Sequence, residues 1–292
     1  MTAFFACEAP KSLEGLAWLA CYLTTGKHMA FYSSFVTVII LLAVTAPLAM
    51  IFGFGGALAA RSPARLLRWF GKGYIAMVRG VPDIVFFLFM PIAIDQALEY
   101  ARHKILCPQV TDPIRQGSDF VVCKIAKLPL SASEQWVHEI YGFALACVSF
   151  AIIFGAFAGN ILFGAMKAVP KAQIETGAAY GMTNRIIFRR IIFPQMWLYA
   201  LPGLSNLWQI LIKATPLLFL LGVEDIVYWA RELGGAKTSA FDYPHPDWRL
   251  WYFLVLLVFY LLLTYGSETI FSRLIRKADY TTMQSSDSGA AK

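Results

Sequence analysis

Five long apolar segments constrain this 292-residue chain more than any other feature of its sequence. A helix needs roughly 20 predominantly apolar residues to cross a hydrocarbon layer about 30 Å thick. Segments that reach this length lie at about 31 to 60, 76 to 98, 140 to 166, 196 to 223 and 249 to 271. Because 58% of the residues are hydrophobic and only 15% are charged, the sequence predicts an all-α, polytopic membrane protein with about five transmembrane helices.

The distribution of basic residues predicts how these helices are oriented. Short loops on one side carry 13 of the 25 lysines and arginines with few acids: Arg61, Arg65, Arg68, Lys72, Lys167, Lys171, Arg185, Arg189, Arg190, Arg273, Arg276, Lys277 and Lys292. Basic residues next to spans favour the cytoplasmic side. We therefore expect a multi-pass membrane protein with its N-terminus outside and its C-terminus in the cytoplasm. The net charge of +7 is assigned to orientation and anionic membrane lipid, not to nucleic acid.

The two ends of the chain differ from the transmembrane domain, which we place at residues 31–275. Residues 1–30 are predicted to be an external segment, because Glu8, Pro10 and Lys11 break a signal peptide or a sixth span. A short interfacial helix is expected over residues 13–23. Residues 276–292 are predicted to be a disordered cytoplasmic tail.

A long external loop is predicted at about residues 99–139. Loops of more than about 15 residues are functional or disordered, and the sequence does not choose between these. Cys107 and Cys123 lie in this loop, and in an oxidising compartment they are the pair that we expect to form a disulfide. Four external cysteines allow three connectivities, and two unpaired thiols are the alternative.

Polar side chains interrupt the predicted spans at a few positions. Arg79 and Asp83 are four residues apart, so a helix would place them on one face as an ion pair, with a gating or interface role as the alternative. Asn160 and Lys213 are costly in lipid. We expect each to bond to a neighbouring helix or to line a translocation path, and we add Thr215 to the candidate path.

The segment from residue 175 to 194 is a polar and basic island between apolar stretches. It contains Glu175, Gly181 and three arginines, which cannot lie in hydrocarbon. The island must therefore face water, and we expect it to meet a protein partner.

Catalytic motifs are not found in the sequence. A phosphate-binding loop needs two glycines with four residues between them, then Lys and Ser or Thr, and no segment has this pattern. His138 and Glu139 resemble the start of a zinc-binding helix, but Gly142 stands where the second His is required. We expect no enzyme activity, no metal and no cofactor bound by this chain.

The island resembles the cytoplasmic motif of ABC importer permeases, written E-A-A, three residues, G, nine residues, I-x-L-P. Glu175, Gly181, Ile191 and Pro194 have this spacing, with Thr176 and Gly177 at the alanine positions. Segments 79–82, 188–195, 201–202 and 221–226 resemble the polar amino acid permeases that include histidine, glutamine and arginine permeases. The resemblance covers about residues 31–275.

This resemblance implies a type I ABC importer (MetI-like) permease fold, a location in the bacterial inner membrane and a function in import. The chain would be the transmembrane subunit of an ATP-driven importer of polar or charged amino acids, or related small solutes. The implied partners are an ABC ATPase dimer that binds ATP and Mg, a second permease subunit that is identical or homologous, and an external solute-binding protein.

Within the motif, we expect Glu175 in the first turn of a helix and Gly181 in the turn that follows. Ile186, Ile187, Ile191 and Ile192 are expected to supply the apolar face that contacts the ATPase. The alternative function is a secondary transporter or channel for a small polar solute. An ion gradient would drive that transporter, with Lys213 or Asp83 as the titrating group.

Overall fold

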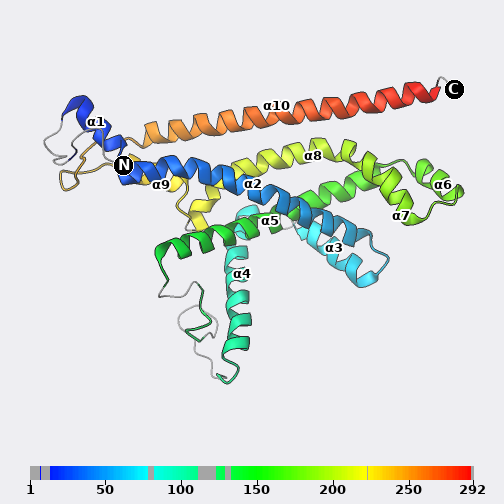
Figure 1. Ribbon diagram of the computed structural model, residues 1–292, viewed down its shortest axis with the longest axis horizontal. Coiled ribbons are helices and arrows are strands. Elements are labelled where there is room, and N and C mark those ends of the chain that lie inside the picture. Colours follow the sequence, from blue (N-terminus) through cyan, green and yellow to red (C-terminus); the bar gives the residue numbers. More distant parts are fainter. Residues whose placement is uncertain are drawn as a thin grey trace. The chain divides into compact units, whose positions relative to one another are not determined.

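The computed structural model describes residues 7, 14–77, 82–110, 123–128, 133–221 and 223–290. These residues are helical nearly throughout (Figure 1), with an isolated antiparallel bridge between Lys237 and His245. The chain divides into two compact units. The first unit is Met1–Ala43 with Lys213–Leu263, and the second is Val44–Ile212 with Thr264–Lys292.

Four helices in the described ranges are long and apolar enough to cross a membrane. They are α2 (Gly26–Arg61), α4 (Asp83–Leu106), α5 (Gln135–Ala168) and α10 (Arg249–Ala290). These helices coincide with four of the five predicted spans. The remaining predicted span falls on α8 (Phe193–Ala214) and the 3-10 helix η3 (Thr215–Leu221). Asn206, Gln209 and Lys213 lower the hydropathy of α8, and such residues in membrane helices face protein or water.

The first unit ties a short N-terminal helix to the segment before α10. This helix, α1 (Gly15–Leu23), carries a disulfide from Cys21 to Cys7. The Tyr22 hydroxyl donates to the carbonyl oxygen of Leu233, at 3.2 Å, and shares a second hydrogen bond with Nε2 of His245, at 2.9 Å. The helix lies within the segment 13–23 for which the sequence predicts a helix, and its position at the membrane surface stays a prediction.

Also in this unit, α9 (Ile226–Gly234) begins at a buried carboxylate. One oxygen of Asp225 accepts hydrogen bonds from the amides of Val227 and Tyr228, at 3.1 and 2.9 Å. These two bonds satisfy amides that have no partner within the helix. At the other end of α9, Glu232 accepts from Lys27 at 2.8 Å and from Lys237 at 3.1 Å.

Glycines bring three helices of the second unit into backbone contact. A Cβ at Gly71 of α3 (Arg65–Met77) would lie 2.3 Å from the amide nitrogen of Ala60 in α2. A Cβ at Gly53 of α2 would lie 2.9 Å from the Gly155 carbonyl oxygen and the Gly159 amide in α5. Gly155 and Gly159 therefore allow close contact between α5 and α2, because a side chain at any of these positions would separate the backbones.

The last helix continues through the predicted tail. The structure carries α10 on as helix to Ala290, across residues for which the sequence predicts a disordered tail.

Candidate coupling site

The polar island folds as a helical hairpin in the second unit (Figure 1). Its first arm is α6 (Lys171–Ala179), and its second arm consists of α7 (Asn184–Ile187) and the π-helical turn η2 (Phe188–Ile192), which continues into α8. A proline disfavours helical backbone at the residue before it. The positions of the arms therefore follow from Pro170, because α5 ends at Ala168 and α6 begins directly after this proline.

This helix start corrects the expected position of Glu175. The carboxylate lies in the second turn of α6 and not in the first, because the helix begins four residues earlier, at Lys171. The exposed amides of the first turn therefore do not hold it. Glu175 is exposed to solvent, where a partner can reach it.

The hairpin turn is a Schellman motif centred on Gly181. The Met182 amide donates to the Gly177 carbonyl at 3.0 Å, and the Gly181 amide donates to the Ala178 carbonyl at 2.9 Å. Gly181 has a φ of +76°, in the left-handed region where a glycine carries no Cβ penalty. The turn is therefore specified by one residue type at one position.

A π-helical turn precedes Pro194 in the second arm. Proline has no amide hydrogen, and its ring clashes with the carbonyl four residues earlier in a regular helix. In this chain that carbonyl belongs to Arg190, which lies within η2. The wider π turn gives the ring room, so α7, η2 and α8 run on as one continuous helical arm.

The isoleucines of the motif hold the hairpin to its own unit. Ile187 and Ile192 are 3% and 2% exposed and pack in a core cluster with Leu162, Met166 and Met196. Ile191 packs against Gly177. The prediction that these isoleucines contact the ATPase is therefore wrong for Ile187 and Ile192, which are covered by α5 and α8. Ile186 is the exposed one, at 41%.

A polar outer surface remains on the hairpin once the isoleucines are packed. Tyr180 is 82% exposed at the turn. Its role was not predicted from the sequence, although its place directly before the turn residue Gly181 indicates an exposed side chain. The other exposed side chains with polar groups include Glu175, Arg185, Arg189 and Arg190. This hairpin surface, defined by Glu175, Tyr180, Arg185, Ile186, Arg189 and Arg190, is what a partner would meet.

The candidate path residues have different environments. Asn160 on α5 and Lys213 on α8 are exposed in the single chain. Thr215, at the start of η3, is buried, and its hydroxyl lies 2.9 Å from the hydroxyl of Tyr260. Thr215 therefore meets a side chain of α10 at the point where α8 changes to a 3-10 helix.

The predicted pair of Arg79 and Asp83 cannot be placed. Arg79 lies outside the described residues, and Asp83 is described only as the first residue of α4. The ion pair and the gating role therefore both stay predictions.

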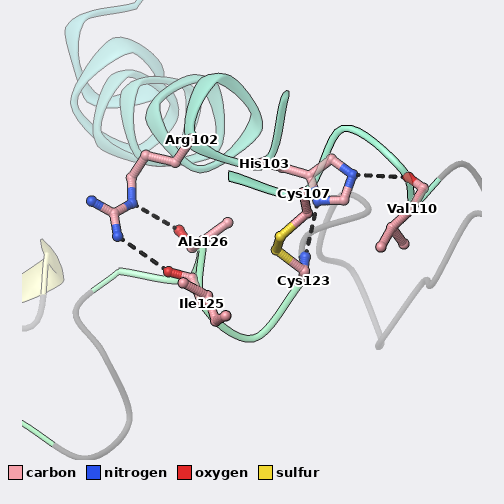
Figure 2. Close-up of a disulfide and its surroundings, with 7 residues drawn as sticks. All are labelled: Arg102, His103, Cys107, Val110, Cys123, Ile125 and Ala126. Atoms are coloured by element: carbon pink, nitrogen blue, oxygen red, sulfur yellow. Dashed lines mark hydrogen bonds between the residues drawn. A yellow bond between two sulfur atoms is a disulfide. The ribbon is translucent and has the colours of Figure 1, made fainter. Parts of the chain in front are cut away.

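The structure joins Cys107 to Cys123 by a disulfide, with a Cα–Cα distance of 6.6 Å. Figure 2 shows that side chains from the end of α4 also bind the segment of this loop that follows Cys123. Arg102 donates to the carbonyls of Ala126 and Ile125 at 3.2 and 3.1 Å, and Nδ1 of His103 accepts from the Cys123 amide at 3.0 Å. These contacts were not predicted from the sequence. The available signal was that polar residues three and four positions apart at the end of a helix share one face, which could then meet the loop.

The same cysteines and His103 have the donor types of a metal site, with ligand atoms within 4.8 Å of one another. The disulfide uses both sulfurs, and a thiolate is the form that binds metal. Nδ1 of His103, which could otherwise bind a metal, already accepts a hydrogen bond from the Cys123 amide. The arrangement fits a stapled loop.

Comparisons with known proteins place the chain in a family. The model of the family "binding-protein-dependent transport system inner membrane component" matches residues 53–280. The histidine/lysine/arginine/ornithine transport system permease protein HisQ of Salmonella typhimurium is 33% identical over 79% of this chain and 85% of its own length. The arginine ABC transporter permease protein ArtQ of Escherichia coli is 29% identical over 73% of this chain and 80% of its own length.

Solved structures show the same fold at low sequence identity. The crystal structure of an amino acid ABC transporter with histidines matches with a TM-score of 0.59 and 18% identity, covering 85% of this chain and 94% of that chain. An inward-facing structure of the MetNI methionine ABC transporter matches with a TM-score of 0.57 and 12% identity, covering 87% and 99%. The chain belongs to the family of binding-protein-dependent transport system inner membrane components, the permease subunits of ABC importers.

Proposed function

We propose that this chain imports polar or charged amino acids, or related small solutes, as the transmembrane subunit of an importer driven by a separate ATPase. The substrate class rests on the relatives, whose names give histidine, lysine, arginine and ornithine for one and arginine for another. The alternative of an ion-gradient carrier is not favoured, because the family consists of binding-protein-dependent permeases.

The observation that carries the coupling proposal is the rigid mounting of the hairpin surface. Ile187 and Ile192 anchor one arm in the core of the second unit, and the Schellman turn fixes the other arm against it. A displacement of the exposed residues would therefore move α5 and α8 with the hairpin, because no flexible loop separates them from it. ATP can shift the permease between states only if the ATPase contacts this surface unequally in its two states.

The proposed assembly contains the partners implied by an ABC importer. An ATPase dimer binds ATP and Mg and docks on Glu175, Tyr180 and the exposed arginines. A second permease subunit, identical or homologous, shares the path, and a solute-binding protein delivers substrate from outside. In this proposal the hairpin is cytoplasmic, the N-terminus is outside and the C-terminus is inside, with α8 counted as the fifth span.

The proposed path includes Asn160 and Lys213. Both are polar and exposed in the single chain, and an amide or ammonium group that faced lipid would be costly. A second permease subunit or a water-filled route would give these groups partners. Thr215, two residues after Lys213, contributes by fixing the start of η3 against Tyr260.

The experiment is ATP-driven uptake in liposomes by the complete complex, with co-purification of the ATPase as a separate readout. We expect Glu175→Lys to remove ATPase binding and uptake, with membrane insertion unchanged. The matched control is Glu139→Lys, which changes an exposed glutamate at the opposite end of α5 from the hairpin. Uptake by this chain without an ATPase would support the carrier alternative. Full uptake by Glu175→Lys would contradict the coupling role.

A further inference from the structure

Between α2 and α3, within the second unit, lies an apolar groove of about 340 Å³ that the proposed function does not use. It is lined by Ile51, Phe52, Gly55, Gly56, Ala59, Leu67, Phe70, Gly71 and Tyr74. The hydroxyl of Tyr74 already donates to the Ile152 carbonyl at 2.6 Å. The other lining side chains are apolar, so the groove is suited to a hydrocarbon chain.

The groove exists because small residues meet large ones along the two helices. Gly55, Gly56 and Ala59 leave the α2 side with little side-chain volume. Gly71 lets α3 approach Ala60 closely, while Phe70 remains 68% exposed at the edge. On α3 the lining residues Leu67, Phe70, Gly71 and Tyr74 recur at three- and four-residue spacing, which makes them one face of the helix.

A basic stripe runs along α3 and borders this face at Arg68, three residues before Gly71, while Arg65 and Lys72 lie farther round the helix. Arg65, Arg68 and Lys72 follow one another at three- and four-residue spacing, so they share a face. No acidic residue occurs in the sequence between Glu14 and Asp83. Within the ranges that the structure describes, none of the three takes part in a recorded ion pair. The stripe therefore offers uncompensated positive charge.

The remaining face of α3 carries large apolar side chains. Leu66 is 77% exposed and Trp69 is 72% exposed. A helix with aromatic and aliphatic residues on one side and basic residues on the other is typical of the interface between lipid headgroups and acyl chains. Tryptophan is enriched at membrane–water interfaces.

We propose that α2 and α3 bind an anionic phospholipid. One acyl chain lies in the groove, and the phosphate lies against Arg65, Arg68 and Lys72. The positive stripe next to a hydrocarbon-lined groove complements the charge and the apolar tail of such a lipid, and a zwitterionic lipid gains less from the stripe because its headgroup has no net charge.

Quenching of Trp69 fluorescence by brominated lipid tests this proposal on the full chain. The purified protein is reconstituted in phosphatidylcholine vesicles that contain equal mole fractions of brominated phosphatidylglycerol or brominated phosphatidylcholine. The signal of Trp69 is the difference between the wild-type protein and Trp69→Phe. We expect an apparent affinity for the anionic lipid about 5-fold higher or more, since each basic residue near an anionic headgroup contributes about this factor.

Two variants separate the stripe from the groove. The triple change Arg65→Gln, Arg68→Gln and Lys72→Gln should bring the preference close to one, whereas the same change at Arg273, Arg276 and Lys277 should leave it unaltered. Gly55→Leu should fill the groove and lower quenching by both lipids, because no atom lies within 4 Å of a Cβ there. Gly164→Leu, on α5 and equally open, is its matched control.

Three results would overturn the proposal. The first is equal quenching by the two brominated lipids in the wild-type protein. The second is a preference that survives the triple change at the stripe. The third is protection of Trp69 from both lipids by a second protein subunit, which would make the groove a protein interface.

Discussion

Gly177 and Ile191 are in contact across the hairpin: a Cβ on Gly177 would lie 2.8 Å from Cδ1 of Ile191. The next nearest atoms are Cγ1 of Ile187 at 3.4 Å and Sδ of Met182 at 3.5 Å. The two arms of the motif are therefore spaced by the absence of a side chain at one position of α6. This spacing predicts that position 177 accepts only small residues.

Gly177→Ala should be tolerated and Gly177→Leu should not. The atom that a methyl group meets is the end of a flexible side chain, which can rotate, and Ala favours a helix over Gly by about 1 kcal/mol. A leucine would force the arms apart at a cost of about 1 to 3 kcal/mol. Thermal unfolding of the purified chain measures both. Equal loss of stability in the two variants would contradict this account of the spacing.

Substitutions at Gly181 should act through the backbone alone. No heavy atom lies within 4 Å of a Cβ built there, but the φ of +76° is unfavourable for residues with a side chain. We expect Gly181→Ala to lower the free energy of unfolding by about 1 kcal/mol and Gly181→Asn by less, because Asn tolerates the left-handed region. Gly181→Val should be the most harmful. Urea or thermal unfolding in detergent gives the order, and a wild-type value for Gly181→Val would refute it.

The stapled loop after α4 should respond to loss of its disulfide. Cys107 and Cys123 are 16 residues apart, and a cross-link that closes about 15 residues stabilises a fold by about 3 kcal/mol. Replacing both by Ser should therefore increase proteolysis within the loop, although Arg102 still holds Ile125 and Ala126. Limited proteolysis with mass spectrometry locates the cut. Cys147→Ser, at the buried free cysteine, is the control, and equal cleavage in the two variants would argue against the staple.

The sequence predicts features that depend on local pattern. The apolar length of α2, α4, α5 and α10 and the spacing from Glu175 to Pro194 are both read along the chain, and both led to the family. The turn at Gly181 follows from one residue type. The helix start at Lys171 was also readable, because Pro170 stands directly before it.

Other features depend on what lies across the fold. Ile186, Ile187, Ile191 and Ile192 form one apolar group in the sequence, and only packing decides that Ile187 and Ile192 face the chain's own core. The contacts of Arg102 with Ile125 and Ala126 span more than 20 residues. Periodicity names the residues that share a face, but it does not name the surface that this face meets.

The stability of the first unit should depend on pH through Asp225. Burial raises the pKa of this carboxyl to about 6, against the smaller opposing effect of the Tyr228 and Val227 amides, and one oxygen has no recorded partner. The ordinary value is 3.8, so the folded protein retains its proton in a range where the unfolded chain has lost it. Stability from this group is therefore greatest below about pH 4 and declines as the pH rises toward 6.

Asp225→Asn should consequently stabilise the protein at pH 7.5. Asn is also a good N-cap, so it keeps an acceptor for the amides of Val227 and Tyr228 while it removes the buried charge. The gain is at most about 3 kcal/mol for a shift of roughly two pH units, and it should vanish near pH 4. Asp225→Ala removes the cap as well and should lose about 1 kcal/mol relative to Asn. Melting curves at pH 4 and pH 7.5 test this prediction. If Asp225→Asn melted below the wild type at pH 7.5, the charged carboxylate would be shown to stabilise the start of α9.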